Sequence, residues 1–263
     1  ELIKKEVIPA IGCTEPIAVA LCVAKATETL GTRPEKINVL LSANILKNAM
    51  GVGIPGTGMI GLPIAIALGA LVGKSEYQLE VLKDSNPAAV DEGKRFIAEK
   101  RINISLKENI SEKLYIEVCC ESGENKATAI IAGGHTTFIY IARNGGILFS
   151  RQNASSEETK EQTVDLTLRK VYDFGMDAPL DEIRFILETA RLNKAAAESS
   201  FDKNYGHGLG RMLRGTYEHK ILGDSVFSHI LSYTSGACDA RMAGAMIPVM
   251  SNSGSGNQGI AAT

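Results

Sequence analysis

The chain has 263 residues, of which 44% are hydrophobic and 22% charged, a composition typical of a folded globular protein. With 28 Lys and Arg against 30 Asp and Glu the net charge is −2, and no basic run accompanies the 5% of aromatic residues, which excludes a typical nucleic-acid-binding protein. An odd number of cysteines, five, in a chain long enough to bury its own core argues against a secreted disulfide scaffold and favours a reducing, cytoplasmic setting.

The two ends of the sequence predict that the chain is truncated. It begins at Glu1, without an initiator Met or the charged-then-apolar pattern of a signal peptide. It stops at Thr263, just after small residues that look like the start of a helix. We therefore expect the chain to be part of a longer protein.

The first part of the chain, residues 1–75, is predicted to be mostly helical with one strand. Helical periodicity indicates helices over Leu2–Ala10 and Ile17–Leu30, the second of them apolar nearly all round and therefore buried. Alternating apolar residues that end in an apolar run predict a strand over Lys36–Ala43.

A long uncharged segment between Lys47 and Lys74 raises the alternative of a small membrane transporter. Its continuous apolar run, Met59–Val72, has 14 residues, which is too short to cross a bilayer. We therefore predict a glycine-rich loop that leads into a buried helix, and no membrane partner.

Residues 76–160 are predicted to form a small α+β unit with an antiparallel sheet, inserted between helical parts. A polar helix, Pro87–Lys100, begins it, and Asn144-Gly145-Gly146 is a hairpin signal near its end. The polar residues Gln152–Lys160 are interpreted as a linker. The predicted strands are Arg101–Leu106, Leu114–Cys120, Ala127–Ala132, Thr137–Ala142 and Gly146–Ser150.

Residues 161–263 are predicted to return to helices and to be incomplete at their end. A helix is expected over Leu180–Phe201, followed by a Gly-rich break at Tyr205–Gly210 and apolar stretches that reach Ala245. The predicted fold class is therefore α+β, with a mostly helical part that carries the inserted α+β unit.

The segment Gly51–Gly56 has the spelling G-x-G-x-x-G of a dinucleotide-binding loop. That chemistry needs the loop to join a strand directly to a helix, whereas seven residues separate this loop from the predicted strand, and Pro55 removes an N–H donor. A flexible structural loop is the preferred interpretation. A substrate-contacting loop stays open, because Asn44, Lys47 and Asn48 precede it.

The five cysteines divide into two groups. Cys22, Cys119 and Cys120 lie in predicted helix or strand and are interpreted as packed thiols. Cys13 and Cys238 each lie in a predicted turn of small and polar residues, and Cys13 precedes a helix N-terminus, which favours the thiolate that binds metals or attacks carbon. A functional and a structural role are both open for each. The absence of a C-x-x-C pair argues against a zinc ribbon or a thioredoxin-like site.

Two further segments could carry chemistry. Residues 250–259 hold eight small polar residues, and the N–H groups of Gly254–Gly256 with the hydroxyls of Ser253 and Ser255 predict a loop that binds a carboxylate or phosphate, with a plain linker as the alternative. His135 starts a predicted strand after two glycines, and it is either an acid/base residue or a hydrogen-bonded structural histidine.

Read together, four motifs resemble the bacterial and archaeal L-cysteine desulfidase family, whose catalytic part is similar to the alpha chain of iron–sulfur L-serine dehydratases. They are Gly12-Cys13-Thr14-Glu15-Pro16, the loop Val52–Thr57, Gly134-His135-Thr136 and Ser251–Gly259. The resemblance runs from Glu1 to Thr263. It implies β-elimination of L-cysteine to pyruvate, ammonia and hydrogen sulfide; L-serine dehydratase and an inactive amino-acid-binding relative are the alternatives.

The resemblance also implies a [4Fe–4S] cluster held by three cysteines, with one iron open to a small amino-acid substrate. Cys13 and Cys238 fall at two of the ligand positions, and the third is expected beyond Thr263, so a complete cluster is not expected in this chain alone. His135 or Lys47 would be the catalytic base, and a homodimer is left open. The implied substrate-binding residues are Asn44, Asn48, Ser253, Gly254, Ser255 and Asn257.

Overall fold

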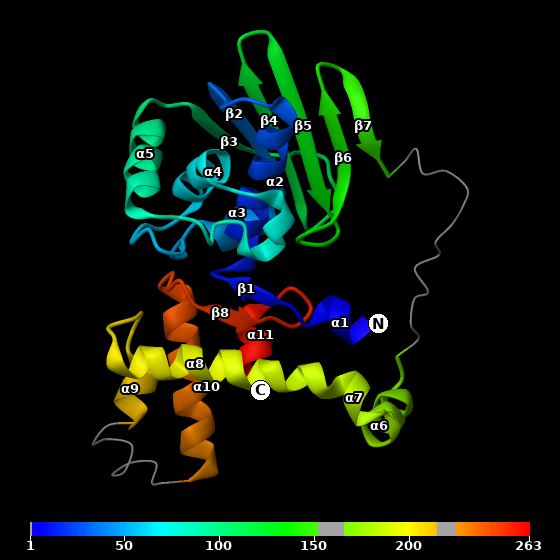
Figure 1. Ribbon diagram of the computed structural model, residues 1–263, viewed down its shortest axis with the longest axis vertical. Helices are drawn as coiled ribbons and strands as arrows, with labels where there is room; N and C mark the ends of the chain where they lie inside the picture. Colours follow the sequence, from blue (N-terminus) through cyan, green and yellow to red (C-terminus); the bar gives the residue numbers. More distant parts are fainter. Residues whose placement is uncertain (1, 152–165, 215–224) are drawn as a thin grey trace.

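The computed structural model describes residues 2–151, 166–214 and 225–263, so the predicted linker Gln152–Lys160 lies outside the described residues. Figure 1 shows a sheet with its covering helices above and a group of helices below. The short strands β1 (Pro9–Ile11) and β8 (Pro248–Met250) lie between these two parts. The predicted α+β class is confirmed.

The upper part is built on a mixed sheet with the strand order β3-β2-β4-β5-β6-β7. Its strands are β2 (Lys36–Leu41), β3 (Ile102–Leu106), β4 (Tyr115–Ser122), β5 (Asn125–Ala132), β6 (Phe138–Arg143) and β7 (Gly146–Ser150). Every predicted strand is found, with ends displaced by at most two residues. The sheet is not purely antiparallel as predicted, because β2, from the first part of the chain, enters between β3 and β4 and pairs in parallel with β3.

Helix α2 (Thr14–Leu30) is the centre of the core and packs on β4, β5 and α4 (Leu62–Leu71). It is buried on nearly all sides, as its apolar sequence predicts. The two helices approach closely at Gly69, where a Cβ would lie 2.6 Å from the carbonyl oxygen of Ala20. Helix α5 (Pro87–Ala98) covers the outer side of α4.

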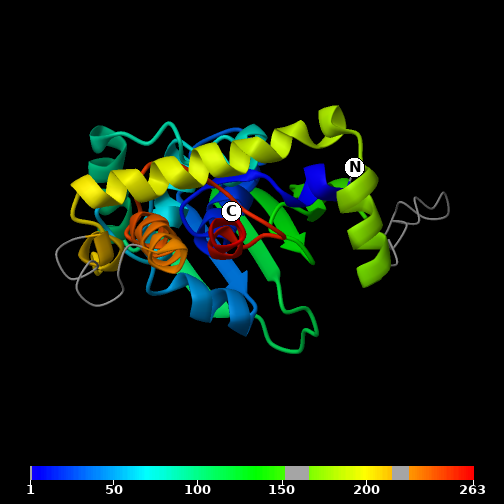
Figure 2. The ribbon, with the colours of Figure 1, turned by 90° about the horizontal axis from the view of Figure 1, so that it is seen from below.

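The lower part is a group of helices around the pair α8 and α10. Its elements are α6 (Leu168–Asp177), α7 (Leu180–Ile183), η2 (Arg184–Ile186), α8 (Leu187–Asp202), α9 (Leu209–Arg214), α10 (Val226–Met242) and α11 (Gly256–Ala261). In Figure 2, α8 crosses the underside of the molecule, with α10 and α11 beside it. Gly236 lets α10 approach α8, since a Cβ there would lie 2.6 Å from Ser200 Oγ.

The N-terminal helix prediction is partly wrong. Helix α1 (Leu2–Glu6) is short, and Pro9–Ile11 instead forms β1, which pairs antiparallel with β8. Proline is tolerated as the first residue of a strand, where its missing N–H matters least. This pairing brings Gly12 and Cys13 beside the C-terminal segment.

The helices that were not predicted include α3 (Ala43–Ala49), which lies just before the glycine-rich loop, the 3₁₀ helix η1 (Ser75–Glu80) and α6 (Leu168–Asp177). Within the described part of the chain, no helix is both long enough and apolar enough to pass through a bilayer.

Candidate functional site

A pocket of about 370 Å³ lies where the two parts of the molecule meet. It is formed by the N-terminal end of α2, α3, the β5–β6 connection, the end of α10 and the loop before α11. The residues that line it are Cys13, Thr14, Glu15, Asn48, Val52, His135, Arg241, Met242, Ser253, Gly254, Ser255 and Asn257.

Cys13 is the N-cap residue of α2 and is 3% exposed. Its Sγ donates to Met242 Sδ at 3.3 Å. The preceding Gly12 has φ +81°, and a Cβ there would lie 2.5 Å from Pro55 Cγ, so this turn requires glycine. Burial raises the pKa of the Cys13 thiol, and the positive charge of Arg241 opposes this. The expected lowering by the helix N-terminus is therefore outweighed by the loss of solvent.

Cys238 lies inside α10 and not in a turn as predicted. Burial raises the pKa of its half-buried thiol, which Arg241 opposes. The charge of a Cys238 thiolate also raises the pKa of Cys13, so the two thiols lie within electrostatic range of each other. The structure thus brings together the two cysteines singled out in the sequence, with Arg241 close to both, although Cys238 does not line the pocket itself.

Arg241, one helical turn after Cys238, is only 6% exposed. Its Nε donates to the carbonyl oxygen of Gly12 at 3.1 Å, and one terminal nitrogen donates to Asn257 Oδ1 at 2.8 Å. No carboxylate among the described residues pairs with it. Gly256 lies against the guanidinium so closely that a Cβ would overlap Nε. A buried positive charge without a counter-charge points to an anionic ligand in the pocket.

The loop before α11 contributes Ser253, Gly254, Ser255 and Asn257 to the pocket, as the sequence predicts for an anion-binding loop. Ser253 and Gly254 have φ of 49° and 75°, in the left-handed region, so the backbone makes a tight turn here. Within the described residues, no acceptor is found for the N–H groups of Gly254 and Gly256. The Ser255 hydroxyl accepts from the Gln258 N–H and so caps α11.

His135 lies in the connection between β5 and β6 and packs against the loop, since a Cβ at Gly254 would lie 2.6 Å from its Nδ1. Burial lowers the pKa of His135 below its ordinary value of 6.5; the negative charge of Glu15 opposes this, and the positive charge of Arg241 adds to it. The neutral ring, which can accept a proton, is therefore favoured near neutral pH.

The lowered pKa of His135 predicts a pH-dependent stability. The unfolded chain takes up a proton near the ordinary value of 6.5, whereas the folded chain does so only at lower pH. This contribution to stability is therefore present above that value and is lost as the pH falls toward the folded pKa. We expect His135→Gln to flatten the fall in melting temperature between about pH 8 and about pH 5.5. The exposed His207→Gln is the control, and equal slopes for wild type and His135→Gln would contradict the prediction.

The amide groups of the Gly51–Gly56 loop bind protein backbone and not a ligand. The N–H of Gly53 donates to Met242 O and that of Gly56 to Gly244 O, each at 3.0 Å, so these amides hold the end of α10 and are not available to a phosphate. This agrees with the structural interpretation of the loop. Asn44 and Lys47 are exposed on α3 and do not line the pocket, whereas Asn48 does.

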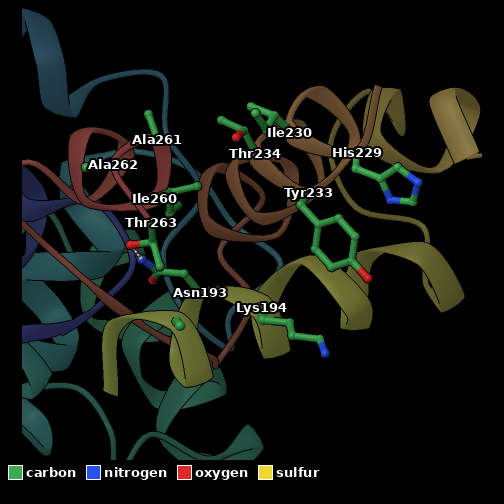
Figure 3. Close-up of a pocket in the computed structure, with 11 residues that line it drawn as sticks. Asn193, Lys194, His229, Ile230, Tyr233, Thr234, Ile260, Ala261, Ala262 and Thr263 are labelled. Atoms are coloured by element: carbon green, nitrogen blue, oxygen red, sulfur yellow. Dashed lines mark hydrogen bonds between the residues drawn. The ribbon is translucent and has the colours of Figure 1, made fainter. Parts of the chain in front are cut away.

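A larger pocket of about 560 Å³ lies between α8, α10 and the end of α11 (Figure 3). In Figure 3, Asn193 points toward Thr263, and its Nδ2 donates to the Thr263 hydroxyl at 3.0 Å. Asn193 Oδ1 also accepts from the Met250 N–H at 2.8 Å, so this side chain holds β8 and α11 in place. Of the described residues that line this pocket, none is a cysteine, aspartate or glutamate. The Cys13 pocket is therefore the candidate site.

Comparison of the sequence with known proteins shows the family of this chain. The family model for the serine dehydratase alpha chain matches residues 76–263. The chain belongs to this family. It is 80% identical to a UPF0597 protein of Bacteroides fragilis over 262 residues, 76% to one of Bacteroides thetaiotaomicron over 263, and 51% to one of Porphyromonas gingivalis over 268.

Each of these alignments covers 100% of the chain and 61% or 62% of the relative. The chain thus spans about three-fifths of the length of the curated relatives it matches. No solved structure matches it.

In this member of the serine dehydratase alpha chain family, Glu15, Arg241 and Met242 also line the pocket, although no prediction from the sequence named them as site residues. The signal was present in the spacing. Arg241 follows Cys238 by three residues, which places both on one side of a helix, and Glu15 lies in the first turn of the helix that Cys13 caps.

Proposed function

We propose that the full-length protein is an amino-acid β-elimination lyase that converts L-cysteine to pyruvate, ammonia and hydrogen sulfide. The observation that carries this proposal is the position of the buried Arg241 between two thiols. Its Nε donates to the carbonyl oxygen of Gly12, next to Cys13 in the pocket, and it follows Cys238 by one turn of α10. Membership of the serine dehydratase alpha chain family supports lyase chemistry at that pocket.

The donor set fits part of a [4Fe–4S] site. Within the described residues, no group of three or more His, Cys, Asp or Glu side chains could hold a metal ion. Cys13 and Cys238 would supply two thiolate ligands, the type that such clusters use, and a third would come from outside this chain. The charge of Arg241, which favours both thiolates, would offset the negative charge of the site. When bound, the cluster would supply a Lewis-acidic iron that stabilises negative charge on the substrate.

The residues of the chain would then hold the substrate and move its proton. Arg241, with Asn257 bonded to it, would bind the carboxylate, and His135 would take the proton from Cα because its ring is neutral. The electron pair left by that proton forms the Cα–Cβ double bond as the Cβ–S bond breaks, and the sulfur leaves with a proton as hydrogen sulfide. The remaining 2-aminoacrylate tautomerises to the imine, which water hydrolyses to pyruvate and ammonia. Lys47, exposed outside the pocket lining, remains a sequence prediction for the base.

L-Serine is the second candidate substrate, favoured by the family description. The same residues would act on it, with the β-hydroxyl leaving as water. A thiolate is the better leaving group and the softer partner for iron, which favours L-cysteine.

The test uses the full-length protein, loaded with iron and sulfide without oxygen and assayed for pyruvate on L-cysteine and L-serine. We expect faster turnover of L-cysteine, and we expect Cys13→Ala and Cys238→Ala each to lose the visible absorbance of the cluster together with about 100-fold or more of the activity. Cys119→Ala, a partly exposed thiol on β4, is the matched control and should keep both.

Three outcomes would change the assignment. Retained colour in both Cys13→Ala and Cys238→Ala would refute the ligands. A preference for L-serine would make the protein a dehydratase, and binding of amino acids without pyruvate would make it an amino-acid-binding relative.

A further inference from the structure

Glu15 and Arg241 place one negative and one positive charge on the wall of the same pocket. The two charges do not neutralise each other or any third group, because no ion pair joins either side chain to another described residue. Unpaired charges in a partly buried site are costly unless a ligand compensates them. The wall therefore offers one site for an anionic group and one for a cationic group.

The carboxylate of Glu15 is held in place by neutral donors. Asn48 Nδ2, on α3, donates to Oε1 at 3.3 Å, and the Thr14 hydroxyl donates to Oε2 at 3.1 Å. Each oxygen keeps a further lone pair, since a carboxylate can accept about four hydrogen bonds. Glu15 is thus oriented but not satisfied, and it can receive a positively charged donor.

Both charges line the pocket that also holds the thiol and the imidazole. Glu15 and Arg241 share its wall with Cys13 and His135. Glu15 lies in the first turn of α2, and Arg241 lies near the end of α10, so the two charges come from different elements. A free α-amino acid carries a matching pair, an ammonium and a carboxylate on one carbon atom.

We infer that Glu15, oriented by Asn48, receives the α-ammonium group of the substrate while Arg241 receives its carboxylate. This deepens the proposed function and rests on it for the identity of the substrate. Glu15 would be a specificity-determining residue that selects α-amino acids over acids of the same length without the amino group. Asn48 would be a positioning residue, which acts through Glu15.

The experiment measures binding without turnover, in the full-length, anaerobically loaded protein. L-Alanine carries both charges but no β leaving group, and propanoate is the same acid without the amino group. We expect wild type to bind L-alanine more tightly, and Glu15→Gln to raise the Kd for L-alanine about ten- to a hundredfold while leaving that for propanoate within about twofold. Asn48→Ala should raise the Kd for L-alanine by a smaller factor, and the exposed Glu124→Gln is the matched control.

The outcomes separate this inference from the lyase proposal. If pyruvate forms from L-cysteine but neither Glu15→Gln nor Asn48→Ala changes the Kd for L-alanine, the inference is overturned and the lyase proposal stands. If binding of L-alanine depends on Glu15 but no pyruvate forms from L-cysteine or L-serine, the inference stands and the lyase proposal fails. A fall in kcat with unchanged Kd in Glu15→Gln would also overturn it, because it would place Glu15 in the chemical step.

Discussion

Replacing Arg241 by Met is expected to lower kcat/KM for L-cysteine in the full-length, loaded protein by about 10²- to 10³-fold. Met keeps the length and most of the volume of the side chain, but it removes the positive charge that lies near Cys13, Cys238 and His135. It also removes the bonds to Gly12 O and Asn257 Oδ1. The measurement is steady-state pyruvate formation under anaerobic conditions.

Arg184→Met is the matched control, because that side chain is 73% exposed and pairs with Asp181, three residues earlier in the chain. It should leave kcat/KM unchanged. The melting temperatures of both variants show whether a loss of activity comes from lost catalysis or from a less stable fold. An Arg241→Met protein that keeps wild-type kcat/KM would show that the guanidinium serves the fold alone, and the anionic ligand would have to be placed elsewhere.

Gly259→Ala should be the most destabilising single substitution near the site, at about 2–4 kcal/mol. A Cβ at this position would overlap the carbonyl oxygen of Met250 and lie 2.9 Å from the backbone of Ser251. Both contacts are to backbone of β8 and its continuation, which cannot move without breaking the pairing of β8 with β1. Urea unfolding of the full-length protein measures the change.

Gly175→Ala in α6 is the control for that experiment, since no atom lies within 4 Å of a Cβ there. Alanine is the better helix former, so this variant should be as stable as wild type or more stable by up to about 1 kcal/mol. Equal free energies of unfolding for Gly259→Ala and wild type would contradict the close backbone contact between α11 and β8.

The sheet and the core helices could be predicted because their signals are local. In strands β4 and β5, buried residues alternate with more exposed ones, because one face of the sheet packs on α2. Helix α2 is apolar nearly all round because it is enclosed. The parallel pairing of β2 with β3 could not be predicted. Pairing order depends on contacts between segments far apart in the chain, which no periodicity records.

The errors have a common physical origin in non-local packing. Strands β1 and β8 have three residues each, too few for a periodic signal, and they are strands because they pair with each other. The segment around Cys238 is predicted as a turn because its residues, Gly236 among them, are small and polar. That glycine is in fact a helix residue that allows α10 to approach Ser200 of α8.

In the candidate site, Cys13, His135 and the loop before α11 could be singled out because cysteine, histidine and glycine are unusual in such settings. Glu15 and Arg241 have a weaker signal, which is their spacing from Cys13 and Cys238, because charged residues are common and most of them are solvated. The fold adds that both line one pocket and that neither has an ion-pair partner among the described residues.

The antiparallel pairing of β1 with β8 also fixes when the pocket can exist. Cys13 and Met242, which touch across it, are separated by 229 positions in the chain. A ribosome that adds about 5–20 residues per second needs roughly ten to fifty seconds between the two. During that interval the nascent chain exposes Cys13 without its later neighbours, so a cluster of the kind proposed above could form only after translation of this region. Reagents that alkylate thiols should label stalled nascent chains at Cys13 far faster than finished protein.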